Sequence, residues 1–230
     1  MSQDTRDQIL DTAERLFADR GIDAVSLRTL TTEAGVNLAS VHYHFGSKEA
    51  LVTEVFGRRI ERLNRERLEL LDEVERQAGD GPLPLEPVLR ALFAPAIRTS
   101  QESGSTFMRL CGRMYAEPAE YVQKYFDEKF RPVIERFTAA FARATPELSP
   151  KERGWRLHFA VGAMVFTMSE SEKLKRYSRG LCDPANVEEA IEHMVHFAAS
   201  GLRAPALLTA EDPADERKTT LPPEPEEVTV

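Results

Sequence analysis

A short run of polar and aromatic side chains near the N-terminus has the residue types needed to contact nucleic acid. Between residues 37 and 44 the chain carries Asn37, Ser40, His42, Tyr43 and His44. Amide, hydroxyl, imidazole and phenol groups hydrogen-bond to phosphate oxygens and to the edges of bases. The chemistry that this stretch indicates is therefore recognition by hydrogen bonding.

These groups need a short helix that its neighbours hold in place, because a helix of this length is unstable alone. Asn37 is a suitable N-cap for such a helix, in which Val41 and Phe45 lie four residues apart and face inward. Ser26 caps the preceding helix, and Gly35 suits the left-handed turn that ends it. Two helices joined in this way form a helix-turn-helix, whose second helix enters the major groove of DNA.

At these residues the chain resembles the TetR family of bacterial transcriptional repressors. Two stretches carry the resemblance: T-A-E-R-L-F-A-D-R-G over 12–21 and A-G-V-N-L-A-S-V-H-Y-H-F-G-S-K-E-A-L over 34–51. One position departs from it, because the family most often has tyrosine where this chain has His42. The resemblance implies contact with double-stranded operator DNA through Ser26, Arg28, Thr29, Asn37, Leu38, Ala39, Ser40, His42, Tyr43, His44 and Lys48.

The charge balance, taken alone, argues against DNA binding. The chain holds 30 Lys and Arg against 38 Asp and Glu, a formal net charge of −8. The tail over 204–230 accounts for −5 of this, but residues 1–50 still carry five basic against eight acidic side chains. The DNA-binding interpretation therefore depends on the motif, with phosphate contacts from a few placed donors and from helix N-termini.

Other classes of protein find little support in the composition. A hydrophobic content of 42% is ordinary for a globular protein, and we expect no membrane segment and no signal peptide. Two cysteines form no disulfide framework and favour a cytoplasmic location. No catalytic motif is present, so we expect no enzyme and no cofactor. His193 and His196 lie three residues apart without a second pair, so we expect no metal.

The pattern predicts an all-α fold with an N-terminal helix-turn-helix domain over 1–50. A proline-free helix from Lys48 to about Gln77 leads into a helical ligand-binding and dimerisation domain over 51–203. Basic residues between 58 and 67 alternate with glutamates, which is typical of an exposed charged helix face rather than a nucleic-acid stripe. The tail over 204–230 is acidic and rich in proline, so we expect disorder.

Further helices are predicted near 86–99, 105–116 and 118–143, and aromatic and Met side chains gather in them. They form either an ordinary helical core or an apolar ligand pocket. The expected lining residues are Phe107, Arg109, Arg113, Met114, Phe126 and Phe130. The two arginines either pair with Glu117 or bind the anionic head of an amphiphile. The segments R-L-C-G-R at 109–113 and E-P at 117–118 resemble the PsrA-type, fatty-acid-responsive subgroup, which implies a fatty acid or acyl-CoA.

Two apolar helices, one following Ser149 and one starting at Asp183-Pro184, favour self-association as a four-helix bundle. In the TetR family this is the dimer interface, here expected at Trp155, Phe159, Gly162, Phe166, Ile191, Met194 and Val195.

Together these features predict a homodimeric repressor that binds a palindromic operator and is released by a small hydrophobic effector. The alternative is a helical protein-interaction module that never binds DNA.

Overall fold

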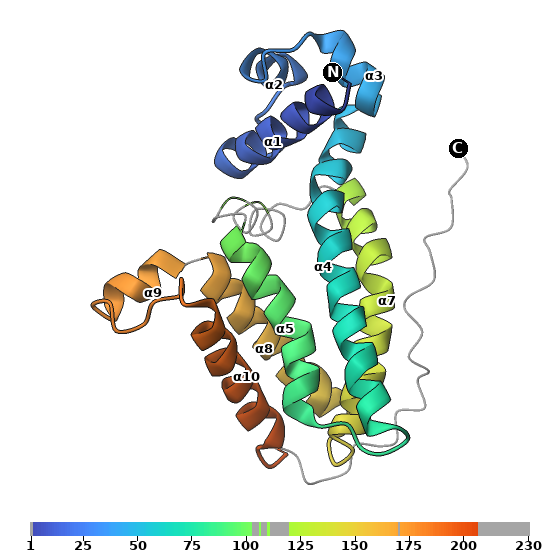
Figure 1. The fold of residues 1–230 in the computed structure, drawn as a ribbon, viewed down its shortest axis with the longest axis vertical. Helices are drawn as coiled ribbons and strands as arrows, with labels where there is room; N and C mark the ends of the chain where they lie inside the picture. Colours follow the sequence, from blue (N-terminus) through green and yellow to red (C-terminus); the bar gives the residue numbers. More distant parts are fainter. Residues whose placement is uncertain (1, 103–105, 107–109, 111–119, 170, 207–230) are drawn as a thin grey trace.

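The computed structural model describes residues 2–102, 106, 110, 120–169 and 171–206 (Figure 1). Regular structure in these residues is entirely α-helical and contains no strand, which confirms the predicted all-α class. A group of three helices lies at one end of the molecule, and a long helix, α4, runs from it into a larger helical body (Figure 1). Within the described residues, no helix is both long and apolar enough to span a membrane.

The small end of the molecule is built by the first helices. Their bounds are α1 Ser2–Arg20, α2 Leu27–Glu33 and α3 Leu38–Phe45, and α4 follows over Lys48–Ala78. Apolar side chains from all four meet in one core, among them Ile9, Phe17, Leu30, Val41 and Val52, which are buried. Burial of these side chains, rather than the propensity of each short helix, holds the unit together.

The long helix α4 belongs to both parts of the molecule. Ser47 caps it, accepting a hydrogen bond from the Ala50 N–H at 3.1 Å, and Gly79 ends it with a positive φ of 58°. Its 31 residues span roughly 46 Å at 1.5 Å per residue. The predicted domain boundary at residue 50 therefore falls inside a continuous helix, which gives a rigid connection between the two parts.

Among the described residues, the body adds four helices of 17 to 25 residues and one short helix to α4. They are α5 Leu85–Glu102, α7 Glu120–Ala144, α8 Pro150–Ser169, α9 Ser171–Tyr177 and α10 Val187–Arg203. Helix α4 packs against α5 and α7, and α10 packs against α5 and α8. Helix α9 projects from the side of the body (Figure 1). The helix predicted over 105–116 lies outside the described residues, except for 106 and 110, which are helical.

The start of the last helix differs from the prediction. Asp183-Pro184 was expected to begin it, but α10 begins at Val187 and Asn186 occupies its N-cap position. The Asp183 carboxylate instead accepts hydrogen bonds from the Ala185 N–H at 3.1 Å and from Lys175 at 2.7 Å. Asp183 therefore holds the turn that joins α9 to α10.

Candidate nucleic-acid interface and ligand cavity

The helix-turn-helix forms through local contacts that the sequence predicted. The Thr29 N–H donates to Ser26 Oγ at 3.0 Å, which caps α2. The Ser40 N–H donates to Asn37 Oδ1 at 2.8 Å, which caps α3. Between them Gly35 has a φ of +64°, a conformation that a residue without Cβ adopts at little cost. Ser26 and Asn37 therefore set where the two helices begin, and Gly35 allows the turn between them.

Helix α3 has one buried anchor and an exposed polar surface. Val41 is fully buried, whereas Tyr43 keeps 81% of its surface exposed and Leu38 is also exposed. The His42 Nδ1–H donates to the Gly46 carbonyl oxygen at 3.0 Å. His42, the position that departs from the TetR pattern, thus helps to close the C-terminal end of α3 while its ring stays exposed.

The eleven residues expected to contact DNA lie on α2, on the turn, on α3 and at the start of α4, at one end of the molecule. Seven of them are exposed: Ser26, Arg28, Asn37, Leu38, Ala39, His42 and Tyr43. Four are half-buried: Thr29, Ser40, His44 and Lys48. The Tyr43 and His44 rings meet edge to face with centroids 5.0 Å apart, so the two aromatic groups form a single surface.

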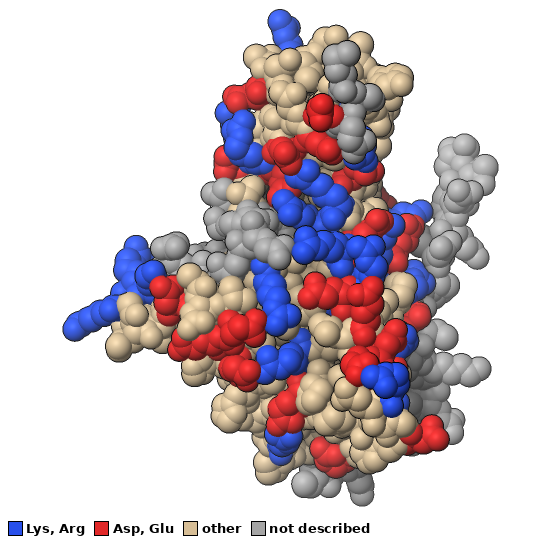
Figure 2. All heavy atoms as spheres, viewed as in Figure 1, with Lys and Arg blue, Asp and Glu red and all other residues tan. Residues whose placement is uncertain are grey.

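Ion pairs at this end leave only a few cations for a ligand. Glu33 accepts hydrogen bonds from Arg15 at 3.1 Å and from Arg20 at 3.3 Å, and these guanidinium groups lower its pKa. Within the part of the chain that the structure describes, Arg28 and Lys48 form no ion pair. The face in Figure 2 is mostly uncharged over α2 and α3, with acidic and basic side chains mixed below them. Residues 1–50 keep a net negative charge, although Arg58 of α4 pairs with two of their carboxylates, those of Asp11 and Glu14, and Arg28 and Lys48 are the cations available to a ligand.

Arg58 and Arg67 of α4 differ from the exposed charged face that was predicted, whereas Arg62 and Arg65 are exposed as expected. Arg58 hydrogen-bonds Asp11 of α1 at 2.7 Å and also pairs with the buried Glu14. Arg67 keeps only 5% of its surface exposed, and its Nε–H donates to the Leu92 carbonyl oxygen at 2.9 Å. These side chains tie α4 to its neighbours and are not available to nucleic acid.

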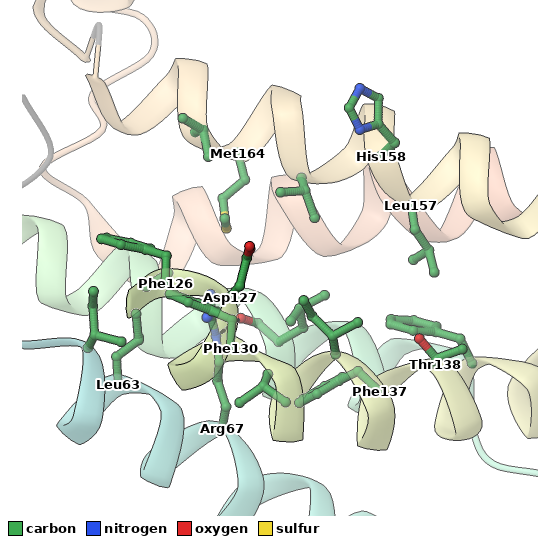
Figure 3. Close-up of a pocket in the computed structure, with 18 of the residues that line it drawn as sticks. Leu63, Arg67, Phe126, Asp127, Phe130, Phe137, Thr138, Leu157, His158 and Met164 are labelled. Carbon is green, nitrogen blue, oxygen red and sulfur yellow. Dashed lines mark hydrogen bonds between the residues drawn. The ribbon is translucent and has the colours of Figure 1, made fainter. Parts of the chain in front are cut away.

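A cavity of about 930 Å³ lies in the body between α4, α5, α7 and α8 (Figure 3). Most of its lining is apolar or aromatic, with Leu157 and Met164 pointing into it from α8. The predicted residues Phe126 and Phe130 line it from α7. The other predicted residues, Phe107, Arg109, Arg113 and Met114, lie outside the described residues. A volume of this size suits a small organic ligand.

Several cavity residues were missed by the sequence analysis. Arg67 reaches the cavity beneath Phe130, with its guanidinium carbon 5.9 Å from the centre of that ring. Phe137 and Thr138 line the far end. The α7 residues could have been found from the helical spacing of their aromatic side chains. Arg67 had no such signal, because it sits in a run of alternating charges.

The residues of α8 that were predicted to form the dimer interface are exposed in the structure. Trp155, Phe159 and Phe166 are exposed on one side of α8, and the Trp155 and Phe159 rings stack at 5.7 Å. Gly162 is exposed between them, with no atom within 4 Å of a Cβ built on it. Exposed aromatic surfaces of this kind are typical of protein interaction sites.

The prediction that three α10 residues are presented to a partner at this interface needs correction. Ile191, Met194 and Val195 are buried in the chain's own core, where α10 packs against α5 and α8. A partner cannot reach them. The exposed apolar residue of α10 is Phe197, which keeps 60% of its surface exposed.

The side-chain caps, the presented helix and the helical body are those of a helix-turn-helix DNA-binding regulator. A family model described as "Bacterial regulatory proteins, tetR family" matches residues 9–55, and one described as "Tetracyclin repressor-like, C-terminal domain" matches residues 90–201. The chain belongs to the TetR family of bacterial transcriptional regulators.

Known proteins resemble the chain in two different ways. The HTH-type transcriptional repressor KstR2 of Mycolicibacterium smegmatis is 44% identical over 50 residues, which are 22% of this chain and 24% of that protein. The match to such curated relatives thus spans about a quarter of their length, at the helix-turn-helix. PfmR, a TetR family regulator from Thermus thermophilus, has a TM-score of 0.61 at 18% identity, covering 87% of this chain and 96% of that one.

A second solved structure, the fatty acid degradation regulator FadR from Bacillus halodurans, has a TM-score of 0.60 at 14% identity. The match covers 87% of this chain and 97% of that one. At such identities, these two structures establish the shared fold alone.

Proposed function

We propose that the protein is a dimeric repressor that binds a near-palindromic operator and is released from it by an amphiphilic effector. Two copies of α3 lie in successive major grooves, about 34–36 Å apart. The observation that carries this proposal is the arrangement of α3, which buries Val41 and presents Tyr43 beside the exposed Asn37 and His42.

DNA contacts in this proposal divide into two kinds. Tyr43, His44 and the exposed side chains at the start of α3 contact base edges and the sugar-phosphate backbone. Arg28 and Lys48 contact phosphates, and Lys48 does so at the N-terminus of α4, where the helix dipole favours an anion. This small set of contacts fits a segment whose remaining arginines are paired with acids.

The dimer forms through the exposed aromatic side of α8, together with Phe197 of α10. Trp155, Phe159 and Phe166 give this surface an apolar centre of the kind that carries binding energy at protein interfaces. A two-fold dimer buries the same patch on both copies. The two pairs of helices then form a four-helix bundle.

The effector occupies the cavity between α4, α5, α7 and α8. Its α7 wall runs from Gln123 to Phe141, a rise of roughly 27 Å along that helix. Such a long apolar wall fits an extended acyl chain better than a compact polycyclic molecule. We therefore propose a long-chain fatty acid or acyl-CoA.

Release requires only that the effector bind more tightly to a dimer whose two reading helices no longer match the operator spacing. Helix α4 is placed to connect the sites, because Ile60, Leu63 and Arg67 line the cavity while Arg58 pairs with α1. A structural change in the cavity therefore acts directly on the helix that carries the DNA-binding unit.

The test is binding to DNA from upstream of the protein's own gene, followed by fluorescence anisotropy. We expect sequence-selective binding that weakens with salt, and release on titration with long-chain fatty acids or acyl-CoAs. Arg109→Ala and Arg113→Ala, which remove the predicted anion partners, are expected to keep operator affinity and to reduce the response. Absence of sequence-selective, salt-dependent binding to this DNA would favour the protein-interaction alternative. A wild-type protein that binds DNA but ignores all acyl compounds would refute the effector class.

A further inference from the structure

One glycine in α4 is in unusually close contact with α7. A Cβ built on Gly57 would lie 2.5 Å from the hydroxyl oxygen of Tyr125 and 3.6 Å from its Cζ. By contrast, a Cβ at Gly154, Gly162 or Gly201, which also lie in helices, would meet no atom within 4 Å. Gly57 therefore allows the Tyr125 hydroxyl to rest directly against the backbone of α4, and burial raises the pKa of that phenol.

The residue that follows Tyr125 connects this contact to the cavity. Phe126 lines the cavity and stacks on Phe130, with ring centroids 5.6 Å apart and planes 9° from parallel. Its ring also meets Phe56 of α4 edge to face, with centroids 5.1 Å apart. Phe56 is fully buried. Phe126 is thus the part of the cavity wall that touches the core of α4 next to Gly57.

The same segment of α4 is bound to the DNA-binding unit on its other side. Glu54 pairs with Arg6 of α1, and Arg58 hydrogen-bonds Asp11 of α1 at 2.7 Å. Arg58 also pairs with the buried Glu14. Residues 54–58 of α4 therefore contact α1 and α7 at the same level of the helix, so a displacement of α7 at this level acts where α4 holds α1.

We propose that Tyr125 and Phe126 are positioning residues that set α4, and that Gly57 is required for their close approach in the operator-binding state. An effector in the cavity contacts Phe126 and moves it away from Phe56, which loosens the Tyr125–Gly57 contact. The effector step rests on the proposed function. The contact between α7 and α4 and its effect on operator affinity need no effector, so the two are tested separately.

A methyl group on Gly57 would imitate this displacement. Ordinary contact between Cβ and another heavy atom begins at 3.4 Å, so Gly57→Ala requires the Tyr125 hydroxyl to move by about 1 Å. The Tyr125 hydroxyl is the end of a half-buried side chain, so the overlap is relieved by turning the ring away from α4, which breaks the contact. Tyr125→Phe deletes the oxygen that the new methyl would meet and leaves Cζ at an ordinary distance of 3.6 Å.

The experiment is a double-mutant cycle on operator affinity, without effector, using Gly57→Ala, Tyr125→Phe and the double variant. We expect Gly57→Ala to weaken operator binding by about tenfold, and the double variant to return to within about threefold of the wild type. Gly201→Ala, a helix glycine with nothing near its Cβ, serves as the control and should bind like the wild type. A Gly57→Ala variant with wild-type affinity, or a double variant as weak as Gly57→Ala, would overturn the proposal.

Folding of each variant is followed by circular dichroism. If Gly57→Ala fails to fold while the double variant folds and binds, the result still supports the contact, because removal of the Tyr125 hydroxyl oxygen restores folding. A double variant that also fails to fold would contradict it.

A second comparison tests the step through Phe126. Phe126→Leu and Phe137→Leu both shorten a phenylalanine that lines the cavity from α7, but only Phe126 contacts Phe56. Binding of palmitate is measured directly by calorimetry, and release is measured from operator DNA. We expect bound palmitate to release the Phe137→Leu variant from operator DNA but not the Phe126→Leu variant. Equal release by both variants at equal palmitate occupancy would overturn the role of Phe126. If the wild type binds no acyl compound, the proposed effector class fails, and the double-mutant cycle still decides the contact.

Discussion

Val41 and Tyr43 lie two residues apart on α3 and have opposite environments. Val41 is fully buried in the core of the small unit, and Tyr43 keeps 81% of its surface exposed. Because the anchor and the presented ring share one short helix, the position of Tyr43 is fixed by packing although no side chain covers it. This relationship makes the role of Tyr43 separable from stability.

Replacing Tyr43 by alanine is expected to abolish operator binding and leave the fold intact. The exposed ring contributes little burial to the folded chain, so its loss should not lower the melting temperature. Gel shift and circular dichroism measured together check this. Tyr177→Ala, which removes an exposed tyrosine from α9, is the matched control and should bind DNA normally. Retained affinity in Tyr43→Ala at unchanged helicity would contradict the prediction.

Replacing Lys48 by alanine is expected to weaken binding to all DNA sequences alike. Loss of one phosphate contact per subunit flattens the slope of log affinity against log salt by about 0.9 for each contact. A salt titration of the wild type, Lys48→Ala and Lys124→Ala gives the comparison, because Lys124 is exposed on α7 away from the motif. An altered base preference with an unchanged slope would instead assign Lys48 to base recognition.

Phe159→Glu is expected to produce monomers. The substitution places a charge at the centre of the exposed aromatic side of α8, where burial against a partner would leave it unpaired. Analytical ultracentrifugation measures the change, and operator affinity should fall with it because one reading helix remains per particle. Leu181→Glu, at an exposed leucine beyond α9, is the control. A Phe159→Glu dimer of wild-type stability would place the interface elsewhere.

Glu33 gives a prediction about pH. Its hydrogen bond with Arg15, and then the charges of Arg15 and Arg20, lower its pKa below 4.5, so the ionised form is favoured by folding. This contribution is fully present above pH 4.5 and is lost as the pH falls through the lowered pKa. The difference in melting temperature between the wild type and Glu33→Gln should be constant near neutral pH and should shrink in acid. A difference in melting temperature that does not depend on pH would show that the ion pairs are not its cause.

The helix-turn-helix could be predicted because its determinants act over a few residues. Ser26 and Asn37 cap helices through side-chain oxygens that accept N–H groups three residues on, and Gly35 takes the positive φ of the turn. A capping side chain or a turn glycine has the same local effect on the backbone in any protein. The presented side of α3 follows once its buried anchor, Val41, is recognised.

The dimer surface and the cavity could be predicted only in part, because periodicity shows that a face is apolar but not what covers it. Ile191, Met194 and Val195 form such a face, and it is covered by the chain's own helices. Phe197 lies off that stripe and is exposed. Arg67 forms part of the cavity wall because α4, α5 and α7 pack around it. The sequence near Arg67 gives no indication of this packing.

The most direct test of the account is DNase footprinting of the wild-type protein on its own upstream DNA, with and without a long-chain acyl-CoA. The account predicts two protected half-sites about one helical turn apart, related by a near-palindrome, and loss of both protections together when the acyl-CoA is added. A single protected half-site, or protection that spreads without sequence preference, would contradict the paired reading helices. Protection of both half-sites that persists when the acyl-CoA is shown to be bound would contradict its role as the releasing effector.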